Sequence, residues 1–315
     1  IKIKDYETSP SIYEREIIPL KDAVNEFSGN TQPGWRVSSF SSLVDYQSSP
    51  FNEFSDYDKV NESDSSEKNE DEKKFTIFDF PGGIQTGNCW HKIFEELDFQ
   101  ASDDEISEII EDKLSLYNLI SRRESESELN QEKFVAVQKM VKNTLTAKLN
   151  KEELQLQKIS EKDRQAEMEF SLSVENSVDT NRFKELLSNY DYSVNIKNSI
   201  PEGMLKGFID LTFRYNGQYY ILDWKSNKIA ENYDGYKKSS LEQEMEEKNY
   251  HLQYLLYTVA LMKYLQSRLG DVNYDDIFGG VYYLFLRGMQ GQRKKTGIYF
   301  DKPDSDLIQE LMTLL

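Results

Sequence analysis

The stretch at residues 204–226, MLKGFIDLTFRYNGQYYILDWKS, constrains the fold more than any other part of the chain. Its Asn-Gly pair at 216–217 lies between two runs rich in β-branched and aromatic residues, a pattern typical of a two-residue β-hairpin turn. With a turn of that length, Asp210 faces Asp223 directly across two antiparallel strands. Their Cβ atoms would then be about 5 Å apart. A longer turn would shift the register and break this opposition.

The alternation along the hairpin predicts two different faces. The core face is expected to consist of Ile209, Leu211, Phe213, Tyr220, Leu222 and Trp224. The other face carries both aspartates and Lys225. Two opposed carboxylates repel each other, and burial would increase that cost. They are therefore either solvated, or neutralised by Lys225 and Arg214, or bridged by a divalent cation.

A cation between the aspartates would indicate phosphodiester chemistry. Mg²⁺ binds one or two carboxylates, keeps several waters and takes phosphate oxygens as further ligands. Lys225 points to the same face as Asp223 and could hold a scissile phosphate or an attacking water. The pattern of two acids, a metal ion and a lysine favours a phosphodiester hydrolysis site.

Composition sets limits on the alternatives. The formal net charge of -18 argues against a nucleic-acid partner, yet residues 201–315 hold 16 acidic and 14 basic side chains, so the excess lies mostly elsewhere. The single cysteine, Cys89, excludes an internal disulfide, a cysteine-rich zinc site and an iron–sulfur cluster. A reducing cytoplasm is the simplest location for such a chain. No apolar run reaches the ~20 residues that a membrane helix needs.

The chain is expected to have a connecting segment and one α/β domain. Residues 1–36 lack sustained periodicity, and the start at Ile1 rather than Met suggests a segment of a longer protein. Residues 37–315 form the predicted domain, interrupted at 45–74 by an acidic stretch that we expect to be a solvated, mobile linker. Helices are predicted from about residue 89 and at 103–120, 132–157, 181–187, 239–269 and 304–315, with further strands at 166–174 and 280–287.

At this point a family resemblance is visible. GFID at 207–210 and DWKS at 223–226 resemble the Asp…(Asp/Glu)-x-Lys signature of restriction-endonuclease-like nucleases. The longer blocks at 204–227, at 251–261 (HLQYLLYTVAL) and at 278–288 (FGGVYYLFLRG) resemble the RecB family of nuclease domains. The resemblance runs from about residue 35 to the end, and it is thin across the acidic stretch. It implies a mixed central β-sheet flanked by α-helices, with residues 1–36 following a helicase region.

The resemblance also implies roles for individual residues. Asp210 and Asp223 correspond to the metal-binding aspartates, Lys225 to the catalytic lysine, and the backbone carbonyl of Trp224 to a further metal ligand. His91, in GNCWHKIFEELDF, stands where the family has its metal-binding histidine.

Three assignments leave alternatives open. Glu169 is expected to match the family's additional acid, but Glu167 shares its strand parity. Gln253 and Tyr257 fit a QxxxY motif whose spacing puts both on one helical face, or else they lie on a solvated helix side with one packed tyrosine. A late basic cluster, consisting of Arg287, Arg293, Lys294, Lys295 and Lys302, could meet a DNA backbone or be a solvated loop.

The implied activity is Mg²⁺-dependent cutting of DNA single strands delivered by an attached helicase during double-strand-break repair. RecC and RecD are the implied partner subunits, and RecA is the implied protein loaded onto the product strand. One alternative is a nuclease fold retained only for docking RecA or RecC. Another is a free-standing exonuclease, although such enzymes usually carry an iron–sulfur cluster that one cysteine cannot hold.

Overall fold

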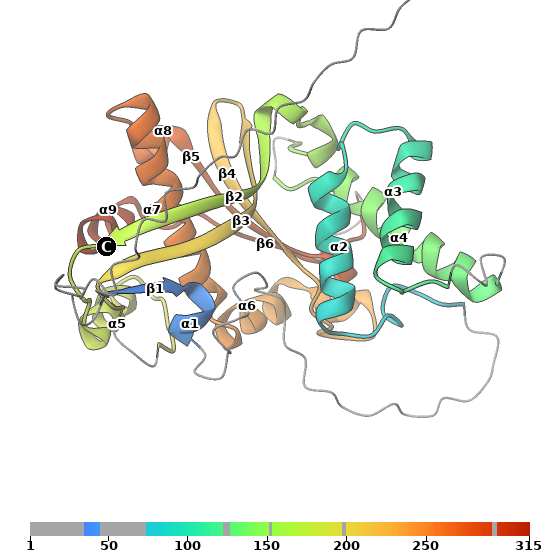
Figure 1. The fold of residues 1–315 in the computed structure, drawn as a ribbon, viewed down its shortest axis with the longest axis horizontal. Coiled ribbons are helices and arrows are strands. Elements are labelled where there is room, and N and C mark those ends of the chain that lie inside the picture. The colour runs from blue at the N-terminus through green and yellow to red at the C-terminus, as the bar shows by residue number, and fades with distance from the viewer. Residues whose placement is uncertain (1–34, 45–73, 122–126, 151–152, 197–199, 292–294) are drawn as a thin grey trace, which may run out of the picture. The chain divides into compact units, whose positions relative to one another are not determined.

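The computed structural model describes residues 35–44, 74–121, 127–150, 153–196, 200–291 and 295–315 (Figure 1). The expectations for the connecting segment at 1–34 and for the acidic stretch at 45–73 lie outside these residues. Regular structure in the described residues begins at Arg36.

A single mixed sheet organises the described residues. Its strands are β1 (Arg36–Ser39), β2 (Arg164–Val174), β3 (Gly203–Tyr215), β4 (Gln218–Lys225), β5 (Phe278–Phe285) and β6 (Ile298–Asp301). The order is β1-β3-β4-β5-β6, with β2 also paired to β3. The β1–β3 and β4–β5 pairs are parallel, and the others are antiparallel.

Helices pack around this sheet (Figure 1). They are α1 (Phe40–Val44), α2 (Ile84–Glu96), α3 (Asp103–Leu116), α4 (Glu128–Thr146), α5 (Thr180–Ser188), α6 (Lys238–Glu247), α7 (Tyr250–Leu269), α8 (Tyr274–Ile277) and α9 (Ser305–Leu314). Helices α2, α3 and α4 pack on one another in sequence order, and α2 also contacts β3. Helix α7 contacts β2 and β4. The predicted α/β class with a mixed central sheet is confirmed.

The hairpin forms with the predicted register. Asn216 and Gly217 both have positive φ, 49° and 83°, as a two-residue turn of this kind requires. The paired residues run from Tyr215↔Gln218 to Leu211↔Leu222, so the next opposed positions are Asp210 and Asp223. The six residues predicted for the core face are all buried, at 0–6% exposure.

Two predicted helices differ from the observed ones. The helix expected to reach residue 157 ends at Thr146, where the side-chain amide of Gln155 donates to the Thr146 carbonyl at 2.7 Å. The apolar residues beyond it are buried by irregular backbone and a short 3-10 turn at Leu156–Lys158 instead. The helix expected at 239–269 is broken at Asn249, which has φ 54° and separates α6 from α7.

Smaller shifts affect other boundaries. Helix α3 ends at Leu116 instead of residue 120, because Asn118 takes a left-handed conformation. Helix α2 begins at Ile84, directly after Gly83 at φ 111°. Strand β5 ends at Phe285, which leaves Arg287 in a 3-10 turn at Leu286–Gly288. Among the described residues, no helix combines the length and apolar character needed to cross a bilayer.

Candidate active site

The two hairpin aspartates lie where β3 and β4 stop pairing. The backbone pairing of β3 with β4 ends at Leu211 and Leu222. Next to it, the Asp210 side chain links the two strands, because its Oδ2 accepts a hydrogen bond from the Trp224 N–H at 2.8 Å. Asp223 is only 2% exposed, and the Asp210 side chain is 15% exposed. Burial, followed by the charges of Asp223 and Glu167, raises the pKa of Asp210 well above its usual value. The solvated alternative for this acid pair is therefore not observed.

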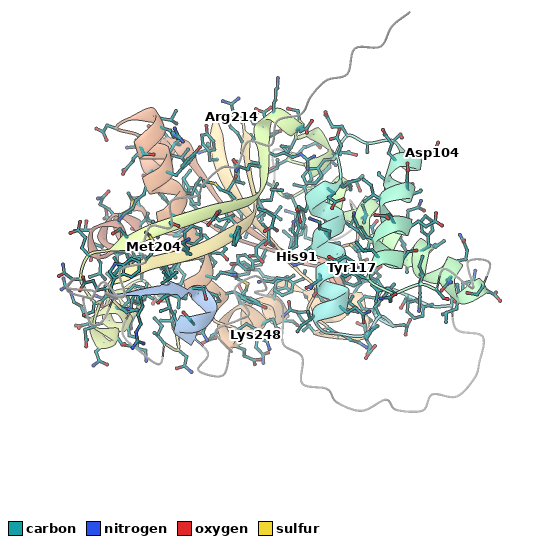
Figure 2. The ribbon with its side chains drawn as sticks, viewed as in Figure 1. His91, Asp104, Tyr117, Met204, Arg214 and Lys248 are labelled. Atoms are coloured by element: carbon teal, nitrogen blue, oxygen red, sulfur yellow. The ribbon has the colours of Figure 1, made fainter. Side chains whose placement is uncertain are left out.

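Lys225 is buried beside Asp223. Its Nζ lies 2.9 Å from Asp223 Oδ1 and 3.9 Å from the ring centre of Tyr250. Arg214, the other suggested neutralising charge, instead pairs with Asp163 at 2.9 Å and lies away from His91 (Figure 2). A buried ion pair carries a large desolvation cost and adds little stability, so its presence here points to function.

His91 joins this group from another element. Helix α2, which contacts β3, carries His91 (Figure 2). The Nδ1 atom of His91 lies 3.4 Å from Asp210 Oδ2. Burial, with help from the positive charge of Lys225, lowers the pKa of His91 to about 3, although a hydrogen bond with the Trp224 backbone acts in the opposite direction. The ring is therefore neutral at pH 7, the form that binds metal ions.

Of the two glutamates considered for the additional acid, Glu167 interacts electrostatically with Asp223 and Asp210, whereas Glu169 faces solvent. Glu167 has φ 48° and is absent from the ladder, although both of its neighbours pair with β3. Burial, followed by the charges of Glu95 and Asp223, raises the pKa of Glu167 to about 7. The Glu169 side chain is 58% exposed and lies 3.9 Å from Lys206. Strand parity could not separate the two, because the backbone distortion at Glu167 has no clear sequence signal.

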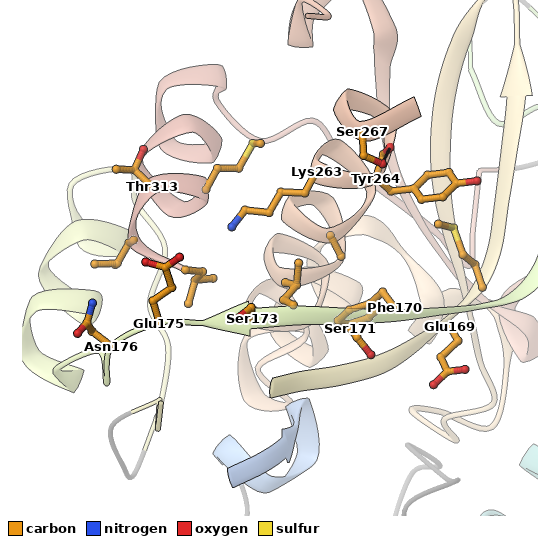
Figure 3. A pocket seen from close by; sticks show the side chains of 16 residues that line it. Glu169, Phe170, Ser171, Ser173, Glu175, Asn176, Lys263, Tyr264, Ser267 and Thr313 are labelled. Carbon is orange, nitrogen blue, oxygen red and sulfur yellow. Dashed lines mark hydrogen bonds between the residues drawn. The ribbon is translucent and has the colours of Figure 1, made fainter. Parts of the chain in front are cut away.

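Glu169 instead borders a separate hollow of about 640 Å³ between β2, α7 and α9 (Figure 3). Lys263 and Glu175 also line it, and burial lowers the pKa of Lys263. Glu169 lies at one end of the hollow, apart from these two side chains (Figure 3). The lining includes none of the other predicted site residues.

Gln253 and Tyr257 both point inward from α7. Gln253 is 1% exposed and Tyr257 4%, so the alternative of a solvated helix side is not observed for Gln253. The Gln253 carboxamide donates to the Tyr257 hydroxyl at 3.1 Å, and its Oε1 accepts from Lys225 Nζ at 3.3 Å. The motif thus connects α7 to the lysine.

Two aromatic residues of the site were not predicted. The Tyr283 hydroxyl donates to Gln253 Oε1 at 2.8 Å, and Tyr250 lies under Lys225. Tyr283 pairs with Asp223 across the parallel β4–β5 ladder. Tyr283 and Asp223 are neighbours only because of this register. In the sequence, Tyr283 is one more aromatic residue of an apolar strand.

Arg287 is not at the surface with the rest of the predicted basic cluster. Arg287 is 1% exposed and donates only to backbone carbonyls within the described residues. Burial lowers the pKa of Arg287 to about 10, so it stays charged at neutral pH. Lys302 lies 3.8 Å from Asp275, and Arg293 and Lys294 lie outside the described residues. Arg287 is therefore unable to contact a phosphate from this position.

The donors in this group fit a hard divalent cation. Asp210 and Asp223 supply carboxylates and His91 supplies a neutral nitrogen, while the Trp224 N–H donates to Asp210. In the described part of the chain, no three His, Cys, Asp or Glu side chains close around one point. These side chains therefore supply only part of the ligands that a divalent cation needs.

A mixed sheet that holds two acids and a lysine at its centre, with a histidine supplied by a neighbouring helix, is the architecture of a metal-dependent nuclease. Comparison with known proteins agrees. Residues 39–314 match the PD-(D/E)XK nuclease superfamily, and the chain belongs to that superfamily. Its members generally use divalent metal ions.

Curated relatives carry the name RecBCD enzyme subunit RecB. The one from Haemophilus influenzae is 33% identical over 91% of this chain and 24% of its own length. The one from Escherichia coli is 35% identical over 76% of this chain and 20% of its own length. The one from Buchnera aphidicola subsp. Acyrthosiphon pisum is 32% identical over 91% of this chain and 24% of its own length. The chain thus spans about a quarter of the length of these relatives.

Proposed function

We propose that this chain is the Mg²⁺-dependent DNA nuclease domain of a RecBCD-type helicase–nuclease, and that it hydrolyses phosphodiester bonds of single strands during double-strand-break repair. The observation that carries the proposal is that His91 contacts Asp210 and Lys225 contacts Asp223, while these two buried aspartates occupy opposed positions of the hairpin. Superfamily membership and the RecB relatives support the same reaction class.

In this proposal each side chain has a separate task. Asp210, Asp223, His91 and the Trp224 carbonyl would hold Mg²⁺, and the carboxyl group of Glu167 would lie on the same side of the site. When bound, Mg²⁺ polarises the scissile phosphate and lowers the pKa of a water molecule.

Lys225 orients the nucleophile and stabilises the negative charge that develops on the phosphate. Asp223 and Gln253 hold its ammonium group between them, so little reorganisation is needed during the reaction. Gln253 and Tyr257, fixed to each other, position the DNA strand beside it.

The proposal extends to the partner proteins and the location of the domain. We propose RecC and RecD as partner subunits, RecA as the protein loaded onto the product strand, and the cytoplasm as the location. The name RecBCD enzyme subunit RecB supports RecC and RecD. Residues 37–315 would be the nuclease domain, and residues 1–36 would connect it to a helicase region.

The test is degradation of linear single-stranded DNA with Mg²⁺ by the wild-type chain and by Asp223→Ala. Cutting that requires Mg²⁺ and falls at least ~100-fold in the variant is expected, because Asp223 is both a metal ligand and the partner of Lys225. If neither protein cuts while calorimetry shows Mg²⁺ binding to the wild type, the site is formed but gated. Neither cutting nor Mg²⁺ binding would leave only the docking module for RecA or RecC.

A further inference from the structure

Arg287 is the large charged side chain that the proposed chemistry does not use. It lies in the 3-10 turn after β5 and is 1% exposed. In the described residues no carboxylate forms an ion pair with it. An unpaired buried cation is costly, so its contacts must be favourable enough to keep it there.

Four of the five N–H donors of Arg287 are engaged by backbone carbonyls. Nε donates to Ser226 at 2.9 Å, and Ser226 directly follows Lys225 at the end of β4. The other donors reach the loop that leads into α2. The acceptors there are the carbonyls of Ile77 at 2.8 Å, Phe80 at 3.0 Å and Pro81 at 2.9 Å.

The guanidinium also contacts α2 itself. Its central carbon lies 4.8 Å from the ring centre of Trp90, the residue next to His91. Gly83, the N-cap residue of helix α2, makes no side-chain hydrogen bond to the helix, so the preceding loop depends on other contacts for its position. Farther along the helix, Phe94 stacks on Trp224 at 4.3 Å. Arg287 thus contacts the loop before α2 and Trp90 within the helix, and Trp224 contacts Phe94 nearer the C-terminal end of α2.

Both elements that Arg287 connects carry site residues. The end of β4 presents Asp223 and Lys225, and α2 presents His91. A planar, rigid fork of donors can fix the separation of two backbone segments, which a single ammonium group does poorly. Groups that orient metal ligands without touching the metal commonly change metal affinity 10–100-fold when they are replaced.

We propose that Arg287 is a positioning residue that sets His91 against the acids of the hairpin by tying the loop before α2 to the end of β4. This inference rests on the proposed function of the same site. In this role Arg287 contacts neither metal nor DNA, so it influences the site only through the position of His91.

The test compares Arg287→Lys with Leu311→Ala. Lysine keeps the charge but loses the fork, whereas Leu311, buried in α9, provides a matched loss of stability away from the site. We expect Arg287→Lys to weaken Mg²⁺ binding about tenfold in calorimetry on the folded protein. Leu311→Ala should bind Mg²⁺ as the wild type does.

A second readout needs no metal. The chain has two histidines, so a His251→Asn variant identifies the ring NMR signals of His91. In metal-free protein, Arg287→Lys should shift the His91 signals and leave those of His251 in place. Leu311→Ala should leave the His91 signals unchanged.

Unchanged His91 signals together with wild-type Mg²⁺ affinity in Arg287→Lys would overturn the inference and leave Arg287 a purely structural residue. If Arg287→Lys does not fold, Arg287→Gln replaces it, with a shift of the His91 signals expected and its absence again contradicting the inference. A wild type that neither binds Mg²⁺ nor cuts would instead contradict the proposed function, and the metal-free NMR comparison would still decide the role of Arg287.

Discussion

Glu167 shows how one backbone angle decides which side chain belongs to the site. Its φ of 48° accompanies a break in the β2–β3 ladder at that residue alone, and its carboxyl lies close enough to Asp223 for the two charges to interact. A non-glycine residue with positive φ inside a strand is strained, and such strain concentrates at functional positions. Glu169, two residues on, has ordinary strand pairing with Phe208 and an exposed side chain.

The two glutamates therefore form a matched pair for mutation. We expect Glu167→Gln to lower Mg²⁺-dependent cutting about 10–100-fold, because it removes a carboxylate beside the proposed metal ligands. Glu169→Gln should stay within about threefold of wild type, since that side chain faces solvent. The measurement is the cutting rate of single-stranded DNA as a function of Mg²⁺ concentration. Equal losses in the two variants, or a larger loss in Glu169→Gln, would contradict the assignment.

At the scale of the element, the β3–β4 hairpin determines the register of the acids. Its two-residue turn places Leu211 opposite Leu222, and the same register places Asp210 opposite Asp223. A change in turn length would move Asp223 to the other face of the sheet, away from Asp210. The turn thus determines the arrangement of the active-site acids, although it makes no contact with them.

Gly217 is the residue on which that turn depends. Its φ is 83°, and a Cβ added there would meet no atom within 4 Å, so backbone strain alone opposes a side chain. We expect Gly217→Ala to lower the free energy of unfolding by about 1 kcal/mol. Asn216→Gly, at a position that also has positive φ, is the control and should change stability by only a few tenths of that value. Urea unfolding measures both, and equal stability of Gly217→Ala and wild type would argue against this turn.

On the scale of the whole molecule, the buried site makes opposing contributions to the pH dependence of stability. His91 has its pKa lowered to about 3, so the unfolded chain binds more protons at that residue, and its contribution to stability grows as pH rises toward 6.5. Glu167 has its pKa raised to about 7, so the folded chain binds more protons there. Its contribution falls as pH rises from 4.5 to 7, and Asp210 acts in the same direction.

Removing Glu167 should therefore change the slope of the pH profile. We expect Glu167→Gln to gain stability relative to wild type between pH 5 and pH 7, by on the order of 1 kcal/mol after allowance for solvent screening. Urea unfolding at both pH values in the presence of a chelator measures this, with Glu169→Gln as the control. A stability difference between Glu167→Gln and wild type that is the same at both pH values would show that the pKa of Glu167 is not raised.

The sequence alone determined the hairpin, its register, the six buried residues of its core face and the pairing of Asp210 with Asp223. These are local features, because an Asn-Gly turn and a period of two specify which residues oppose each other. The family resemblance added His91, Gln253 and Tyr257, whose spacing from the hairpin has no local signal.

Only the tertiary structure decided the rest. A backbone distortion places Glu167 within electrostatic reach of Asp223, and the parallel β4–β5 ladder pairs Tyr283 with Asp223. Arg287, expected at the surface, is buried and links the loop before α2 to the end of β4. The predicted helix at 239–269 breaks at Asn249, where a left-handed residue lets its Oδ1 accept from the Asn195 N–H at 2.6 Å. Each of these outcomes depends on segments far apart in the chain, which local periodicity does not encode.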